Sequence, residues 1–310
     1  MFVLDETSWI AAEADGYLEQ IETLLDNMDQ LRDDNRECVY SEELFYLEVY
    51  DGKTLYELFS ATGELTIPRH VQERIISAFG RLKTWSDLER PWPDELDVSI
   101  GGVGPTFAPS LAWAMKQASQ GARDAVPCLI APAVWPEGLH AVAVGADQSD
   151  VWLASDVKHP GYSRWMAVHG TGRPDEFATW LESAFPNLDF VENCTDGIKE
   201  MSLGYRDLIN SIVAALSVLS DHGPRIFRES WQTAPNAFGA LGVTISDENG
   251  NTKSNKVAEK EHTRTFAGRS IPFWWHIKLQ PDRDRIHLDA TPLHVGNKII
   301  VGIFCRHLKT

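Results

Sequence analysis

Basic side chains alternate with apolar ones in two short segments near the end of the chain. Each segment, 273–279 and 285–290, has the two-residue period of a β-strand, in which successive side chains point to opposite faces. The pattern predicts a hairpin with one apolar face and one polar face. The polar face collects His276, Lys278, Arg285 and His287.

These residue types can cleave an RNA phosphodiester without a metal. The reaction needs a base for the 2′-hydroxyl proton, cations for the charge on the pentavalent phosphorus, and an acid for the leaving oxygen. Histidine can act as the base or the acid, and lysine and arginine supply the cations. We therefore predict a catalytic set that uses no metal and no cofactor. The alternative is that the charged residues are only the solvent face of a half-buried sheet, with incidental histidines.

Further basic residues in the same region are candidates for contacts with nucleic acid. Phosphate neutralisation requires clustered Lys and Arg, and such clustering is found at this end of the chain. We expect RNA rather than DNA as the partner, because the predicted chemistry uses the 2′-hydroxyl. The candidate residues are Arg264, Arg269, Arg283, Arg306 and His307.

Charge is unevenly distributed over the 310 residues, whose net charge is −17. Residues 251–310 hold 11 Lys and Arg against 5 Asp and Glu, a balance of +6, which leaves −23 for the first 250 residues. The first 31 residues hold eight acidic side chains and no basic one. An acidic segment can bind a basic groove as a phosphate backbone would, so the acidic N-terminal helix is also a candidate surface for a protein partner.

Other motifs in the sequence are weaker candidates for a functional site. Four histidines lie between residues 276 and 307, but no pair has the spacing that aims two imidazoles at one ion, so no metal site is expected. Asp156-Val-Lys158, with Asp150 nearby, has the acid-x-Lys pattern of restriction-type nucleases, which is common by chance. The glycine-rich segment 100–105 lacks the GK[ST] of a phosphate-binding loop. No serine lies in a GxSxG motif, so a hydrolase triad is not indicated.

The apolar pattern predicts a mixed α+β fold in three domains. Residues 1–92 have the pattern of a mainly helical, acidic N-terminal domain that contains an amphipathic helix over 7–33. Residues 93–192 alternate short strands with helices, as in an α/β domain. Residues 193–310 form the basic C-terminal domain.

This C-terminal domain is predicted to contain two helices followed by an antiparallel sheet. Gly223-Pro224 is expected to end the first helix, because proline lacks the N–H that continues the hydrogen-bond ladder. The polar segment 247–262, which precedes most of the strands, is expected to be a loop.

Membrane contact and export are not expected from the sequence. The longest apolar runs fall short of the ~20 residues that a membrane span needs, and the N-terminus lacks the basic and apolar regions of a signal peptide. The four cysteines are scattered without metal-binding or redox spacing. We expect a cytoplasmic protein whose cysteines are reduced.

The tail carries a motif that resembles a known group of sequences. WHxKLxPxxDRIHL over 275–288 and VGIFxxHL over 301–308 are similar to the C-terminal signature of uncharacterised bacterial proteins, often from actinomycetes, that are associated with defence. More remotely, two helices followed by an antiparallel sheet rich in Arg, Lys and His resemble RelE/ParE-type toxins. That family includes ribosome-dependent mRNA endonucleases and gyrase poisons. The long polar segment 247–262 and the roughly 190 preceding residues depart from it.

Two functions follow as hypotheses. The first is a toxin-like effector of an antiphage defence system, whose C-terminal domain is a metal-independent ribonuclease. The second is a non-catalytic sensor or adaptor subunit of a multi-protein defence complex, which binds protein or nucleic acid through the same basic face.

Overall fold

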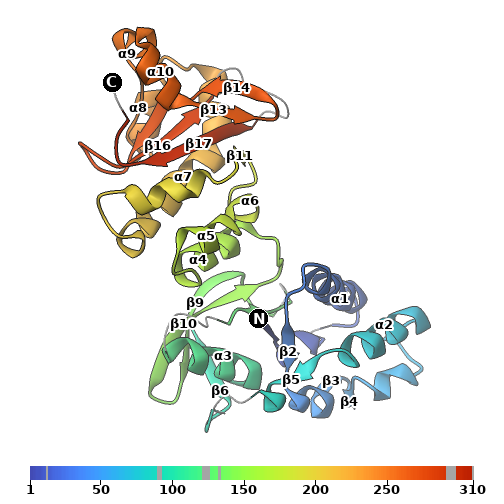
Figure 1. The fold of residues 1–310 in the computed structure, drawn as a ribbon. Helices are drawn as coiled ribbons and strands as arrows, with labels where there is room; N and C mark the ends of the chain where they lie inside the picture. The colour runs from blue at the N-terminus through green and yellow to red at the C-terminus, as the bar shows by residue number, and fades with distance from the viewer. Residues whose placement is uncertain (12, 89–92, 121–125, 132–133, 291–297, 309–310) are drawn as a thin grey trace. The chain divides into compact units, whose positions relative to one another are not determined.

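The computed structural model describes residues 1–310 except 12, 89–92, 121–125, 132–133, 291–297 and 309–310. The chain forms two compact units, Met1–Tyr162 (unit 1) and Ser163–Thr310 (unit 2) (Figure 1). Both units combine helices with a sheet, so the predicted mixed α+β class is confirmed. Within the described ranges, no helix is long and apolar enough to cross a membrane.

Unit 1 is built on one eight-stranded sheet with the order β5-β2-β1-β8-β10-β9-β6-β7. The first five strands in this order run parallel to one another, and the remaining neighbours are antiparallel. The strands are β1 (Phe2–Leu4), β2 (Cys38–Tyr40), β5 (Lys83–Thr84), β6 (Asp97–Ile100), β7 (Val103–Phe107), β8 (Cys128–Leu129), β9 (Gly138–Val144) and β10 (Asp147–Ala154). A small separate hairpin pairs β3 (Glu48–Tyr50) with β4 (Lys53–Thr54).

The described part of unit 1 also contains the α-helices α1 (Tyr17–Asp33), α2 (Arg69–Phe79) and α3 (Pro109–Ser119). α3 packs on β9 and β10 and is buried over most of its length. α1 and α2 contact each other. The predicted helix over 7–33 is therefore shorter at its start, where a 3-10 turn, η1 (Glu6–Trp9), follows β1 instead.

The acidic face of α1 is partly used within unit 1. The guanidinium of Arg74 on α2 lies 2.8 Å from Asp26 and 2.9 Å from Asp29 on α1. These exposed ion pairs join two neighbouring helices, so some carboxylates of α1 are already paired within unit 1.

The two-unit division differs from the predicted three domains. A boundary at residue 92 would cut one sheet, because β1, β2 and β5 precede it and β1 pairs with β8 beyond it. A boundary at residue 192 would likewise separate β11 (Leu188–Phe190) from its partner β17 (Ile299–Cys305). Pairings between segments this far apart leave no local trace in the sequence.

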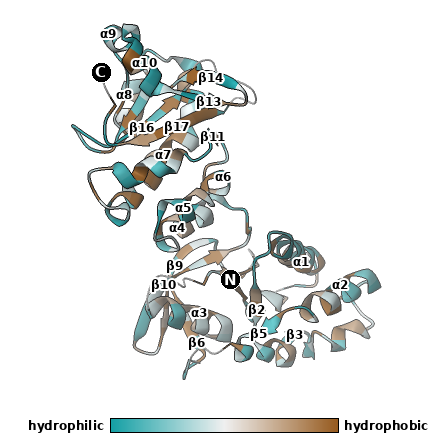
Figure 2. Ribbon diagram, in the orientation of Figure 1, coloured by the Kyte–Doolittle hydropathy of each residue, from teal (hydrophilic) through white to brown (hydrophobic). Residues whose placement is uncertain are grey.

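Unit 2 contains a five-stranded sheet with the order β11-β17-β16-β15-β12. The strands β12 (Ile245–Asp247), β15 (Trp275–Lys278), β16 (Arg285–Asp289) and β17 form the expected antiparallel sheet. β11 adds one parallel pair at its edge. A separate hairpin pairs β13 (Thr263–Phe266) with β14 (Arg269–Pro272). β17 is hydrophobic along nearly its whole length (Figure 2) and fully buried.

The long helix α7 (Tyr205–Glu229) contacts β17 and continues through Pro224, so the expected helix end at this proline is wrong. A proline at this position leaves the carbonyl of Ser220, one turn earlier, without its helical N–H. The side-chain amide of Asn187 donates to that carbonyl at 3.1 Å. The contact replaces the missing bond, and α7 ends instead at Glu229, before α8 (Ala234–Ala240).

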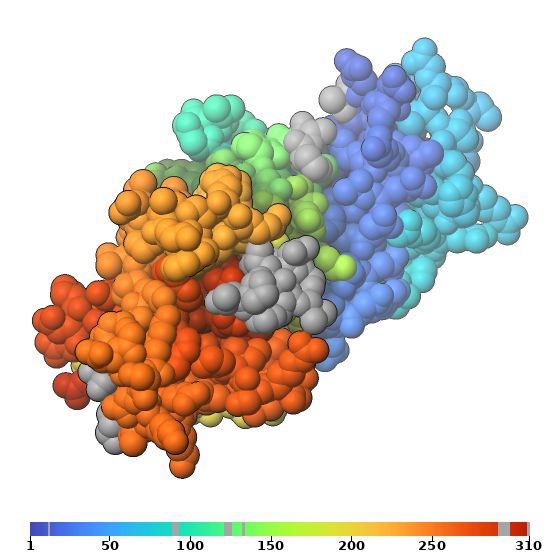
Figure 3. All heavy atoms as spheres, turned by 90° about the horizontal axis from the view of Figure 1, so that it is seen from above, coloured from blue at the N-terminus to red at the C-terminus, as the bar shows by residue number. Residues whose placement is uncertain are grey.

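Short helices complete unit 2. Before β11 the chain forms α4 (Pro160–His169), which begins at the end of unit 1, and then α5 (Pro174–Ala178) and α6 (Leu181–Ala184). The 3-10 helix η6 (Cys194–Glu200) follows β11. The segment 247–262, predicted as a loop, contains α9 (Gly250–Ser254) and α10 (Lys256–His262). Asn249 and Asn255 cap these helices by accepting bonds from backbone N–H groups. Figure 3 views this end of unit 2, with α8, α9 and α10 in orange.

Candidate active site

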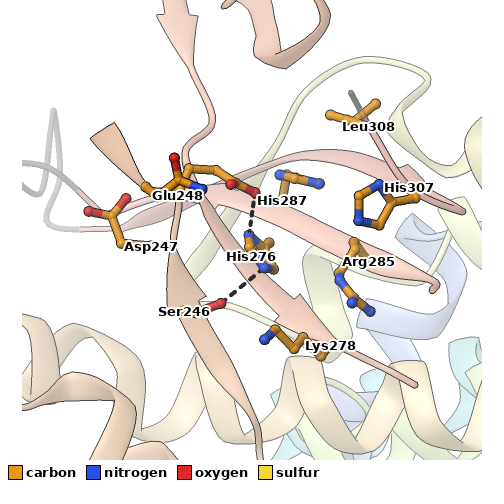
Figure 4. Close-up of a pocket in the computed structure, with 10 residues that line it drawn as sticks. Ser246, Asp247, Glu248, His276, Lys278, Arg285, His287, His307 and Leu308 are labelled. Carbon is orange, nitrogen blue, oxygen red and sulfur yellow. Dashed lines mark hydrogen bonds and ion pairs between the residues drawn. The ribbon is translucent and has the colours of Figure 1, made fainter. Parts of the chain in front are cut away.

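A pocket of about 260 Å³ opens on the polar face of the unit 2 sheet (Figure 4). The four residues predicted to be catalytic all line it, as does His307 from the predicted nucleic-acid set. The complete lining is Ser246, Asp247, Glu248, Asn249, His276, Lys278, Arg285, His287, His307 and Leu308.

The strand register brings these side chains together. Ser246 on β12 lies opposite His276 on β15, and His276 lies opposite His287 on β16. The next row on the same face pairs Lys278 with Arg285. The intervening residues, including Ile277 and Ile286, point into the hydrophobic core, as the alternation predicts.

His276 lies between a hydroxyl and a carboxylate. Its Nε2 is 3.0 Å from Oγ of Ser246, and its Nδ1 is 3.1 Å from Oε1 of Glu248 (Figure 4). A carboxylate beside Nδ1 favours the tautomer with the proton on Nδ1, which leaves Nε2 as an acceptor toward Ser246 and the pocket.

Glu248 is shared by two histidines. Its Oε1 is also 3.9 Å from Nε2 of His262, which is fully buried at the end of α10. The neighbouring imidazoles of His262 and His276 hold the pKa of the Glu248 carboxyl well below its usual range. Glu248 is therefore ionised at neutral pH, next to His276.

His287 has a different environment from its neighbour His276. It is 1% exposed, and its Nδ1 lies 3.2 Å from the carbonyl oxygen of Phe273. A carbonyl only accepts, so this contact places a proton on Nδ1. Burial, and then the nearby His276 and His262, lower the pKa of His287 well below its usual value. The ring is neutral at pH 7, and it packs against the ring of His276 with the centroids 5.2 Å apart.

Arg285 lines the pocket, but backbone carbonyls hold its guanidinium. It donates to Gln280 and Arg283 at 2.6 Å and to Pro281 at 2.8 Å, all within the turn between β15 and β16. Burial lowers the pKa of Arg285 from its ordinary value, although an arginine side chain remains charged in proteins. The residue therefore fixes the turn and contributes positive charge, with few N–H groups left to bind a ligand directly.

Asp284 secures the same turn from the other side. It is fully buried with a left-handed backbone (φ 58), and its carboxylate accepts bonds from the backbone N–H and the hydroxyl of Ser202. Its own N–H donates to the carbonyl of Arg306 at 2.6 Å. These bonds fix the point at which β16 begins.

Lys278 and His307 are the basic residues of the pocket with the fewest contacts to other side chains. Lys278 is partly buried, and His307 is exposed just beyond β17. Among the described residues, neither side chain forms an ion pair or a hydrogen bond. By contrast, the nearby Lys253 is paired with Asp247 at 2.6 Å.

The remaining predicted nucleic-acid residues do not line the pocket. Arg264 donates to the carbonyls of Glu261 and Thr263 at 2.9 and 2.8 Å. The other three are exposed outside the pocket, and they are Arg269, Arg283 and Arg306.

Sequence reasoning missed Ser246, Glu248 and His262. The first two are two residues apart, at and just beyond the end of an expected strand, and this spacing was a usable sign of a shared face. Glu248, however, lies in the segment predicted to be a polar loop, and Ser246 is not part of a GxSxG motif. His262 was undetectable as a site residue, because its contact with Glu248 depends on how α10 packs.

The weaker sequence candidates gain no support. Across the described ranges, no group of three or more His, Cys, Asp or Glu side chains is placed to hold a metal ion. His294, one of the four clustered histidines, lies outside those ranges. In Asp156-Val-Lys158, the carboxylate of Asp156 accepts the backbone N–H of Lys158 at 2.8 Å, which is a local turn contact. The four cysteines are buried and unpaired by disulfides.

Comparison with protein-family models, with curated proteins and with solved structures finds no match for this chain. The resemblance of the tail to defence-associated proteins and to RelE/ParE-type toxins therefore stays a prediction.

Proposed function

We propose that the unit 2 pocket is the active site of a metal-independent ribonuclease. The observation that carries this proposal is the Glu248–His276 pair, which presents a proton-accepting Nε2 to a pocket that also holds the unpaired cation of Lys278. This combination supplies a base and an electrostatic stabiliser within one cavity.

His276 acts as the general base in this scheme. It takes the proton of the RNA 2′-hydroxyl at Nε2, and the oxygen then attacks the adjacent phosphorus. The positive charge that develops on the imidazole is stabilised by Glu248, whose depressed pKa keeps it ionised. His287, neutral and buried, packs behind His276 and does not carry the proton at pH 7.

Lys278 stabilises the charge that develops on the phosphate oxygens. Its ammonium lies on the same face as His276, two residues along β15, and no carboxylate among the described residues neutralises it. Arg285 adds positive potential from its fixed position in the turn. His307, exposed at the pocket edge, is the group placed to donate a proton to the leaving oxygen.

We propose further that the protein works as a toxin-like effector of antiphage defence in the cytoplasm. Support for this biological role comes from the resemblance of the tail sequence. A non-catalytic sensor or adaptor is the alternative outcome of the experiment below.

The test compares cleavage of an RNA and of a DNA of the same sequence by the full-length chain in the presence of a chelator. We expect RNA cleavage and intact DNA. His276→Ala is expected to slow RNA cleavage by about 100-fold or more, and Lys278→Ala and Glu248→Gln by about 10-fold or more, since each removes part of the acid–base or electrostatic assistance.

Lys260→Ala is the matched control, because it removes an exposed cation of the same unit that does not line the pocket and is not a candidate nucleic-acid contact. Its cleavage rate should stay within about twofold of the wild type, as for a surface change outside the site. Equal cleavage of RNA and DNA, or no cleavage of either, would overturn the proposal. RNA binding that weakens steeply with salt, without cleavage, would favour the sensor alternative.

A further inference from the structure

Ser246, His276 and Glu248 form a continuous chain of polar contacts that ends in the pocket. Oγ of Ser246 is 3.0 Å from Nε2 of His276, and Nδ1 of His276 is 3.1 Å from Oε1 of Glu248. The first contact is a hydrogen bond between a hydroxyl and an imidazole, as between a nucleophile and its base, and the second is an ion-pair distance that places a carboxylate charge beside the base. Figure 4 shows both contacts as dashed lines, one between Ser246 and His276 and one between His276 and Glu248.

From this geometry we infer that Ser246 is a nucleophile that forms a covalent ester with phosphate-ester substrates. Two features beyond the distances support it. Ser246 is partly buried yet lines the pocket, so its hydroxyl is reachable by a ligand. The strand pairing places Ser246 directly opposite His276, so the sheet holds the two side chains in register before any substrate arrives.

The cations of the pocket select the class of electrophile. Lys278 and Arg285 line the same cavity, and Lys253 neutralises the lining carboxylate of Asp247, so that these two cations outnumber the one remaining carboxylate, Glu248. An excess of positive charge suits an anionic phosphoryl group better than a neutral carboxylic ester. Lys278 is the cation placed to neutralise charge on the phosphoryl oxygens.

The proposed step balances in atoms and charge. The Ser246 hydroxyl gives its proton to Nε2 of His276, the Oγ–P bond forms, and the P–O bond to the leaving alcohol breaks. The leaving oxygen takes the proton back from the imidazolium. Water then attacks the phosphoserine by the same route, so that phosphate product and free serine are restored.

This inference goes beyond ribonuclease activity, because it requires neither RNA nor a 2′-hydroxyl. It shares His276 as the base with the proposed function. The two activities are separated by a reaction that contains no nucleic acid.

The experiment treats the full-length chain with a fluorophosphonate and locates the adduct by intact mass and peptide mapping. In this reaction Oγ replaces fluoride on phosphorus, and hydrogen fluoride is released. We expect one adduct per chain, mapped to Ser246. His276→Gln should slow labelling by about 100-fold, since it removes the base. Millimolar inorganic phosphate should slow labelling of the wild type and have less effect on Lys278→Ala.

Ser254→Ala is the matched control, because Ser254 is an exposed serine on α9 whose hydroxyl donates to the carbonyl of Asn251. Its labelling should equal that of the wild type. Peptide mapping of the wild type identifies the labelled residue directly. The result therefore does not depend on whether Ser246→Ala folds.

The absence of an adduct, an adduct on another residue, or labelling that is unchanged in His276→Gln would overturn the inference. No adduct together with His276-dependent RNA cleavage would overturn this inference alone. An adduct at Ser246 without RNA cleavage would instead overturn the proposed function alone.

Discussion

At the scale of single residues, neighbouring histidines of one sheet face have been given different chemistry by their surroundings. His276 faces an ionised carboxylate and a pocket, whereas His287 faces a backbone carbonyl and the interior. The second environment opposes protonation of the ring, since burial lowers the pKa of His287. Two residues of the same type, directly opposite each other in the sheet, therefore cannot exchange roles.

His287 makes the stability of unit 2 sensitive to pH. Because its folded pKa is lowered, the unfolded chain binds a proton that the folded chain excludes once the pH falls below about 6.5. The free energy of unfolding should then decrease by up to about 1.4 kcal/mol per pH unit between pH 6.5 and 5. His287→Gln keeps an N–H donor for the carbonyl of Phe273 but cannot titrate, so the free energy of unfolding should depend less on pH in this variant. Denaturant unfolding, followed by hydrogen exchange of β15 and β16, measures the change.

The stability that ionised Glu248 contributes is lost in a separate pH range. Its folded pKa is depressed, so its stabilising contribution is complete above its unfolded pKa of about 4.3 and is lost only as the pH falls below that value. His70→Gln, an exposed change on α2, is the control and should leave the pH 6.5 to 5 slope intact. An identical slope in His287→Gln and in the wild type would contradict the assignment.

At the scale of elements, the site depends on the close packing of η6 against β17. Gly197 in η6 lies against the backbone of Phe304 in β17, so closely that an added Cβ would overlap the carbonyl oxygen of Phe304. Only glycine fits there without moving one of the two backbones. β17 in turn pairs with β16, which carries Arg285 and His287.

Gly197→Ala should therefore destabilise unit 2 by about 3 kcal/mol, because rigid backbone has to move to make room. Thermal unfolding of the full chain measures the change. Gly239→Ala is the matched control, because Gly239 lies in α8 with nothing within 4 Å of its added Cβ. It should be neutral or stabilising by up to about 1 kcal/mol, as for glycine within a helix. Equal stability of the two variants would contradict this account of η6.

At the scale of the whole molecule, each unit carries buried ionisable groups of its own. In unit 1, Asp5 and Glu6 follow β1 and are both fully buried. Glu6 accepts the backbone N–H of Ser110 at 2.8 Å through Oε1, while Oε2 has no hydrogen-bond partner among the described residues. Burial, together with the nearby Asp5, raises the pKa of Glu6 to about 8.

Unit 1 should consequently lose stability as the pH rises. Glu6 keeps its proton in the folded chain up to about pH 8, whereas the unfolded chain releases it near pH 4.5, so the loss develops between these values. Glu6→Gln removes the titrating group and should raise the free energy of unfolding by on the order of 2 kcal/mol at pH 7. Hydrogen exchange of β1 and α3 reports this unit separately from unit 2.

Glu43→Gln is the control for this prediction, because Glu43 is an exposed side chain of the same unit. A surface change of this kind should alter stability by no more than about 0.5 kcal/mol. A Glu6→Gln variant that is less stable than the wild type at pH 7 would show that the carboxylate is needed in its ionised form.

The sequence by itself determined which side chains share a face of the C-terminal hairpin. The period of two in 273–279 and 285–290 separates His276 and Lys278 from Trp275 and Ile277, and a β-strand allows no other arrangement. The mixed fold class and most of the antiparallel strands followed from the same local signals. Each of these properties is set by residues close together in the chain.

The tertiary structure decided the rest, because it depends on contacts between distant segments. Asn187 lets α7 pass through Pro224, and β1 joins β8 in one sheet across the predicted domain boundary. Glu248 reaches His276 only because β12 pairs with β15 in one register, and a slip of one residue would turn Ser246 away from the pocket. The sequence could therefore nominate the histidines and the lysine, whereas the partners that give each one its chemistry are fixed by the register and packing of the folded chain.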